Sequence, residues 1–227
     1  MFHCGEPRAA YELTVGGLAT YDALPAQTAF DQYGQNPMVP MLCTQAIALW
    51  LLGYPDQARR RSQAAVQLAT DQIAPFGIVV ARGFFMMMQQ CVRAGMVEHG
   101  WAEHTILLAS EYGSHVWEGI GQILWGWTLV EHGQREVGWA QLHQGESRLR
   151  IGEGETFQSY VLWLLADAYG RSQQVVTALI TVSDALTLVE KSGERFWEAE
   201  LYRLRGELTL AVAREEKSQK ANLTSSP

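Results

Sequence analysis

The side chains best suited to metal chemistry in this sequence form one short cluster: His99, Glu103 and His104. His99 and Glu103 are four residues apart and could share a helix face, whereas His104 is five residues from His99 and points away. A zinc site would need further ligands from elsewhere in the chain, and a solvated helix face is the simpler interpretation. We therefore expect no metal.

Other catalytic patterns are missing from the sequence. Gly119-Ile120-Gly121 and Gly152-Glu153-Gly154 lack the lysine and the third glycine of nucleotide-binding loops, and there is no Gly-x-Ser-x-Gly elbow. Because these motifs are missing, we expect a protein that is not an enzyme and binds no cofactor. The remaining alternative is an enzyme whose site is assembled from separate helices, such as Glu131 with Asp167. The three cysteines are scattered and are expected to be reduced and mostly buried: Cys4, Cys43 and Cys91.

Composition excludes several classes of protein. Of 227 residues, 48% are hydrophobic and 18% are charged, which is enough apolar material for a core and too little charge for a disordered chain. The net charge of −7 argues against a nucleic-acid partner, which needs a basic face. The most apolar stretch, Met38–Leu52, is too short to span a membrane, and the N-terminus does not resemble a signal peptide. We expect a soluble, cytoplasmic protein.

A short pattern recurs five times: an apolar helix end, a glycine, a polar pair or triplet, and a small residue five positions after the glycine. The pairs are Gly5 with Ala10, Gly53 with Ala58, Gly95 with Gly100, Gly133 with Gly138, and Gly170 with Val175. The glycines are 48, 42, 38 and 37 residues apart, close to one helix pair per repeat. Each glycine is expected to end a helix in the left-handed conformation, which costs glycine little.

Hydrophobic periodicity between these turns predicts an all-α solenoid of stacked helix-turn-helix pairs, with about nine or ten helices and no strands. A single domain over residues 1–214 contains an irregular link at about 22–37, and the polar tail 215–227 is expected to be disordered. The expected helices are Pro7–Tyr21, Val39–Leu52, Pro55–Gln72, Phe76–Ala94, Val97–Tyr112, Val116–His132, Arg135–Ile151, Thr156–Tyr169, Gln174–Lys191 and Arg195–Arg214.

This repeat resembles the tetratricopeptide repeat (TPR). Taking each turn glycine as the fifteenth TPR position puts Ala58 at the small site of a second helix and Gly126 at the small site of a first helix, whereas Ala46, Met88 and Trp163 depart from the pattern. The resemblance implies that first helices line a concave groove with a protein or peptide partner. The groove residues expected from this register are Arg82, Phe85, Gln89, Arg93, Trp127, Glu131, Tyr160, Asp167, Glu200, Arg203 and Glu207.

Whole phrases carry a closer resemblance: Ala48–Ala58, Gly126-Trp127, Ala166–Gly170, and Gly193–Leu201 continuing to Arg205–Leu208. They are similar to the C-terminal TPR region of large bacterial regulatory proteins that join a class III adenylate/guanylate cyclase or another effector to a signalling ATPase. This implies a non-catalytic interaction or sensor module, with the upstream ATPase or cyclase domains as possible partners.

The beginning of the chain leaves an alternative open. Phe2–Gly5 reads as the end of a first helix, so the helix Pro7–Tyr21 would lack the partner that its apolar side chains need. We favour a fragment of a longer protein. The alternative is a self-associating scaffold, a homodimer through residues 7–21. The apolar side chains concerned are Ala10, Leu13, Val15 and Leu18.

Overall fold

The computed structural model describes residues 2–21, 36–92, 99–151 and 157–224, and these residues form ten α-helices and no strand. The expected all-α fold is confirmed. After a 3-10 helix at Phe2–Cys4 come α1 (Pro7–Tyr21), α3 (Met38–Leu51), α4 (Pro55–Asp71), α5 (Pro75–Cys91), α6 (His99–Glu111), α7 (His115–Glu131), α8 (Arg135–Ile151), α9 (Gln158–Arg171), α10 (Val175–Ser192) and α11 (Glu198–Thr224).

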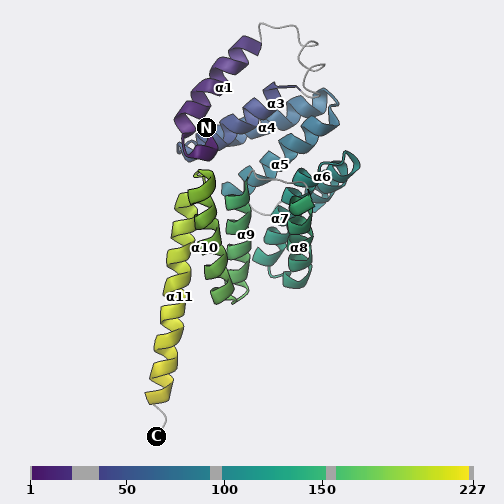
Figure 1. Ribbon diagram of the computed structural model, residues 1–227. Helices are drawn as coiled ribbons and strands as arrows, with labels where there is room; N and C mark the ends of the chain where they lie inside the picture. Colours follow the sequence, from purple (N-terminus) through teal and green to yellow (C-terminus); the bar gives the residue numbers. More distant parts are fainter. Residues whose placement is uncertain (1, 22–35, 93–98, 152–156, 225–227) are drawn as a thin grey trace.

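The helices form two layers of antiparallel pairs (Figure 1). Helices α3, α5, α7, α9 and α11 pack on one another in chain order and make an inner layer. Helices α1, α4, α6, α8 and α10 lie outside them, and most contact both the preceding and the following inner helix. This is the stacking expected of a helical repeat, in which each pair buries its apolar face against its neighbours.

Five of the turns between helices share one geometry. Each has a left-handed residue at its second position, and the next residue donates its N–H to a carbonyl five residues back, as in a Schellman motif. The spacing between these residues is 20 or 40, so one helix with its turn takes 20 residues. The left-handed residues are Gly53, Ile73, Gly113, Gly133 and Gln173, and Gly193 continues the series after α10.

One expected turn glycine is misplaced. Gly170 lies inside α9, and the left-handed turn residue is Gln173, with φ of 63°. The buried small residue five positions later is therefore Ala178 and not Val175, and the register of this repeat moves by three residues. Gly170 instead packs against α11, since a Cβ there would lie 2.9 Å from a methyl group of Leu208. Gly95 lies outside the described residues.

Helices α7 and α8 approach each other through four glycines. A Cβ on any of the four would lie 2.7–2.8 Å from a carbonyl oxygen of the facing helix, closer than van der Waals contact permits. The two backbones therefore touch directly along this pair. The glycines concerned are Gly119 and Gly126 in α7, and Gly138 and Gly145 in α8.

The first residues of the chain bind the loop before α11. The carbonyl of His3 accepts hydrogen bonds from the N–H groups of Arg195, at 2.5 Å, and Phe196, at 3.1 Å. The buried carboxylate of Glu194 accepts from the N–H groups of Phe157, at 2.6 Å, and Ser159, at 2.9 Å, and so caps the start of α9. The two ends of the helix stack are thus tied together.

Helix α1 is only partly covered. It packs on α3, which buries Ala10 and half-buries Leu18. Leu13 and Val15 are 58% and 44% exposed. The expected lack of a partner therefore applies to these two side chains alone.

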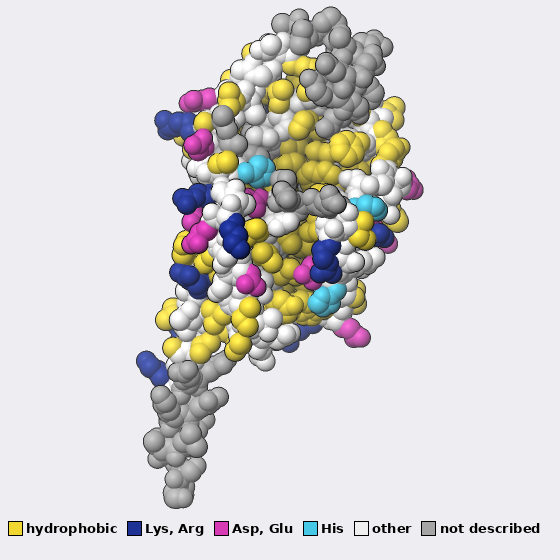
Figure 2. All heavy atoms as spheres, viewed as in Figure 1, with side chains coloured by type: hydrophobic (Ala, Val, Ile, Leu, Met, Phe, Trp, Pro, Cys, Tyr) yellow, Lys and Arg dark blue, Asp and Glu magenta, His cyan; other side chains and the backbone are white. Residues whose placement is uncertain are grey.

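Helix α11 is longer than the sequence predicts. It begins at Glu198 and continues to Thr224, through the polar stretch for which we expected disorder. Residues 215–224 contain no glycine or proline and are rich in Glu, Lys, Gln and Ala, which favour helix. None of the described helices is both long and apolar enough to cross a membrane. Figure 2 shows basic and acidic side chains interspersed on one face of the molecule.

Candidate functional site

A pocket of about 290 Å³ opens in the inner layer, between α5, α7, α9 and α11. We call it the inner pocket. Five of the expected groove residues line it: Gln89, Trp127, Glu131, Asp167 and Arg203. Four further residues complete its wall: Gln90, His132, Trp163 and Arg171.

Helical spacing explains how these side chains meet. Trp163, Asp167 and Arg171 follow one another at intervals of four residues along α9 and therefore share one face. Trp127 and Glu131 have the same spacing on α7, which packs beside α9 in the inner layer. These faces of α7 and α9 thus line the same cavity.

Charged groups on the α7 and α9 walls are joined into a network. Asp167 Oδ2 accepts hydrogen bonds from the indole N–H of Trp127, at 2.8 Å, and from Nε of Arg171, at 2.6 Å. Arg171 also lies 3.5 Å from a carboxylate oxygen of Glu131, and its guanidinium sits 5.7 Å from the Trp127 ring centre. Partial burial by itself would lower the pKa of Arg171, but the hydrogen bond to Asp167 and the surrounding carboxylates outweigh burial and raise it.

The α11 rim of the pocket is also paired. Arg203 donates from Nε to Glu200, at 2.7 Å, and from a terminal nitrogen to Glu207, at 2.5 Å. Burial would lower the pKa of Arg203, but these two hydrogen-bonded carboxylates raise it. Glu200 and Glu207, both expected groove residues, therefore stand beside Arg203 at the rim instead of lining the cavity.

Two of the lining residues, Gln90 and Trp163, carry N–H groups, and we call these two residues the floor of the pocket. Tyr160 is fully buried, and its hydroxyl donates to Oε1 of Gln90 at 2.9 Å, so its expected place in the groove is wrong. Burial raises the pKa of Tyr160, which stays a neutral donor. With Oε1 of Gln90 occupied, its amide NH₂ remains as a donor. Trp163 is 5% exposed, and its indole N–H has no hydrogen-bond partner among the described residues.

Two expected groove residues lie elsewhere. Arg82 stacks over the ring of Trp101 on α6 at 5.0 Å and contacts Nδ1 of His104. Phe85 packs against the same tryptophan, with ring centres 5.2 Å apart. Partial burial lowers the pKa of Arg82. These residues form a separate cluster at the α5–α6 contact, and Arg93 lies outside the described residues.

Three of the four pocket residues that sequence analysis missed follow from the 20-residue turn spacing. The spacing puts the fifteenth TPR position of the α5 repeat at residue 93 instead of Gly95, and Gln90 then falls on a groove position. In the α9 repeat it puts the fifteenth position at Gln173 instead of Gly170, and Trp163 and Arg171 then fall on groove positions. A signal was present in the sequence, because four glycines stand 60, 20 and 60 residues apart: Gly53, Gly113, Gly133 and Gly193. The same correction changes the residue at the small site of the first helix of the TPR pair. In α5 this site holds Met86 instead of Met88, and in α9 it holds Ala166 instead of Trp163.

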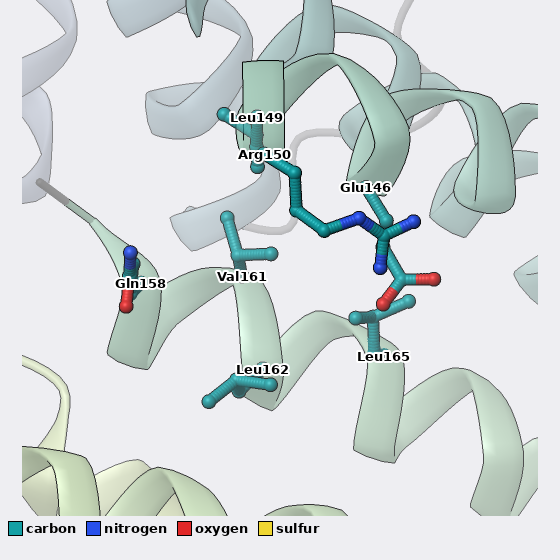
Figure 3. Close-up of a pocket in the computed structure, with 7 residues that line it drawn as sticks. All are labelled: Glu146, Leu149, Arg150, Gln158, Val161, Leu162 and Leu165. Atoms are coloured by element: carbon teal, nitrogen blue, oxygen red, sulfur yellow. The ribbon is translucent and has the colours of Figure 1, made fainter. Parts of the chain in front are cut away.

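A second pocket, of about 220 Å³, lies between α8 and α9 (Figure 3). Its walls are mainly apolar, and in Figure 3 the side chains of Glu146 and Arg150 lie above Leu165. The outer helices α4 and α6 each pack on the inner helix that follows them, α5 and α7. Helix α8 does not pack in this way on α9, and the pocket lies between the two. The apolar lining residues are Leu149, Val161, Leu162 and Leu165.

The remaining chemistry-bearing residues are dispersed. Cys43 and Cys91 lie in helices, and burial raises the pKa of both thiols, whereas Cys4 is exposed. Among the side chains that the structure describes, no three of His, Cys, Asp and Glu converge on a point where a metal could bind.

The fold and the inner pocket together define a class: an all-α protein of stacked helix pairs with a mixed-charge, tryptophan-lined pocket on its inner layer. No protein-family model, curated protein or solved structure matches the chain.

Proposed function

We propose that this chain is a non-catalytic interaction module whose inner pocket binds a side chain of a protein or peptide. The observation that carries the proposal is the contrast between the paired charges of the walls and the donors left at the floor. Asp167 and Arg171 satisfy each other, whereas the Trp163 indole N–H has no partner. A buried donor without an acceptor is costly, and a ligand that displaces the side chains covering this N–H and supplies an acceptor gains that energy on binding.

The wall network supports binding over catalysis. Arg171 bridges Asp167 and Glu131, the two carboxylates that could act as acid and base. A general acid or base must lie within hydrogen-bond reach of the proton that it transfers to or from a substrate. Here oxygens of both carboxylates contact the Arg171 guanidinium, at 2.6 Å for Asp167 and 3.5 Å for Glu131.

Charge identifies the kind of ligand group. Two arginines, Arg171 and Arg203, stand among four carboxylates in and around the inner pocket, so an anionic ligand would be repelled. A neutral acceptor avoids this cost and still meets the floor donors. The group that fits is an amide, either a peptide carbonyl or the side chain of an asparagine or glutamine, flanked by the tryptophan rings.

The resemblance of the helical phrases to the C-terminal region of signalling ATPase and cyclase proteins supports a biological setting. In that setting the module serves a cytoplasmic signalling protein, and its ligand is a segment of a partner or of an upstream domain. A ligand held between α5, α7, α9 and α11 would bias their stacking, because each repeat contacts only its neighbours.

Peptide selection tests the proposal directly. A phage-displayed library of random peptides is panned against the immobilised chain, and selected peptides are titrated by calorimetry. Trp163→Phe keeps an aromatic ring and removes only the floor N–H. We expect this variant to weaken the selected peptides about tenfold, the value of one hydrogen bond to a buried group.

Trp197→Phe is the matched control. Trp197 is also buried and its indole N–H also has no partner, but it does not line the inner pocket. Peptides should bind this variant as they bind the original chain. Failure to select any peptide, or equal binding by the two variants, would contradict the proposal.

A further inference from the structure

The second pocket, between α8 and α9, lies on the opposite face of α9 from the inner pocket. Val161 and Leu165 line the second pocket. Trp163 and Asp167, which line the inner pocket, each follow one of them by two residues, a rotation of about 200° around the helix axis. The second pocket is therefore a separate site.

Helix α8 is fixed beside α9 at one end. The Trp139 indole N–H donates to the hydroxyl of Ser172 at 3.2 Å, and the ring centres of Trp139 and Tyr169 are 4.5 Å apart. These contacts join the start of α8 to the end of α9. The pocket lies toward the other ends of the two helices, where Leu149 and Gln158 line it. The fold thus frames a gap between two neighbouring helices.

A pair of opposite charges stands over the apolar part of this pocket. Glu146 and Arg150 are four residues apart on α8 and so project from the same face of that helix. Figure 3 shows both side chains reaching over Leu165, with the other apolar side chains around them. The pocket therefore combines an apolar body with one anionic and one cationic group.

Both charges have bonding capacity left for a ligand. Arg150 has no hydrogen bond or ion pair with any side chain that the structure describes. Glu146 has one such contact, between its Oε2 and Nδ1 of His143 at 3.4 Å, which leaves Oε1 without a described partner. A ligand that carries both charges can pair with each of them, and charge-assisted hydrogen bonds are the strong ones.

We propose that the second pocket binds a free amino acid with an apolar side chain, such as leucine. The carboxylate of the ligand pairs with Arg150, its ammonium group pairs with Glu146, and its side chain lies among the leucines and Val161. An amino acid supplies both charges on one carbon and is neutral overall, as this charge pair requires.

The size of the pocket agrees with a ligand of this kind. Its volume of about 220 Å³ is below the roughly 300–1,000 Å³ of pockets that take drug-sized molecules. A small molecule with one apolar side chain is therefore the appropriate scale of ligand.

Calorimetric titration with leucine and two analogues tests the proposal. N-acetyl-L-leucine lacks the ammonium charge, and L-leucinamide lacks the carboxylate. We expect L-leucine to bind and each analogue to bind about tenfold more weakly, because each loses one charge-assisted contact.

Two variants assign the contacts to their residues. Glu146→Gln should weaken L-leucine about tenfold without weakening N-acetyl-L-leucine, which has no ammonium group to lose. Arg150→Gln should do the same for L-leucine against L-leucinamide. Glu136→Gln, on the exposed part of α8 outside the pocket, is the matched control. The substituted side chains are exposed or partly exposed, so the variants should fold, and circular dichroism checks this.

Three results would overturn the proposal. The first is the absence of saturable binding by leucine, isoleucine, methionine and phenylalanine at millimolar concentrations. The second is equal binding of L-leucine and N-acetyl-L-leucinamide, which would assign the pocket to an apolar side chain within a peptide. The third is L-leucine binding that neither Glu146→Gln nor Arg150→Gln changes.

Discussion

Gly126 and Gly206 occupy the same register position in two inner helices and meet opposite surroundings. A Cβ on Gly126 would lie 2.7 Å from the carbonyl oxygen of Gly138, whereas a Cβ on Gly206 would meet nothing. The same residue type thus permits close packing in α7 and leaves an open face on α11. The comparison teaches that the effect of a repeat residue depends on whether its neighbour helix is present.

The largest expected effect comes from filling the closed site. Gly126→Ala places a methyl group against backbone atoms of Gly138 and Leu142 that cannot move independently. We expect the free energy of unfolding to fall by about 2–4 kcal/mol, measured by urea denaturation. Gly100→Ala, at an open helical position, is the control and should not destabilise. An unchanged stability would mean that α7 and α8 do not touch as described.

A second expected effect concerns the junction between the first residues of the chain, the start of α9 and the loop before α11. Burial alone would raise the pKa of Glu194, but hydrogen bonds from His3 and from the backbone of Ser159 and Phe157 lower it below its usual 4.5. The ionised carboxylate therefore stabilises the fold fully above pH 4.5, and this contribution is lost as pH falls through the lower folded-state value.

Glu194→Gln tests this pH dependence. The variant should be about 1–2 kcal/mol less stable than the original chain at neutral pH, because the amide oxygen can accept from only one of the two N–H groups and the amide NH₂ faces the other. The difference should shrink on acidification, as the original chain loses its charge. Unfolding curves at several pH values measure it, and a difference independent of pH would contradict the assignment.

The open site should respond with the opposite sign. Gly206→Ala adds a methyl group in free space and improves helix propensity, so the monomer should gain about 0.5–1 kcal/mol. The measurement is made at low protein concentration, where self-association does not contribute. Destabilisation of the monomer would show that the α11 face is covered.

The smallest expected effect lies in the inner pocket. Arg171→Gln breaks partly exposed ion pairs with Asp167 and Glu131, which should cost only about 0.5 kcal/mol and less at high salt. Arg60→Gln, on the exposed face of α4, is the control. A loss of several kcal/mol would assign Arg171 a structural role in place of a ligand-binding one.

Local patterns predicted most of the helices because apolar periodicity and turn glycines act within a few residues. The bounds of α1 and α8 agree with the expected ranges. The turn at Gln173 could not be read from residue type, because a glutamine adopts a left-handed conformation only where the flanking helices hold it there. The error at Gly170 then displaced Trp163 and Arg171 from the expected groove.

By itself, the sequence determined the helical class, the pairing of helices and much of the inner pocket, including Trp127, Glu131 and Asp167. These depend on periodicity and spacing, which are properties of one helix and its turn. Only the tertiary structure decided that Tyr160 is buried under the pocket, that Arg82 packs on α6, and that Gly126 is closed while Gly206 is open. The reason is physical: burial and close approach depend on neighbours distant in sequence, and no local pattern encodes their distance.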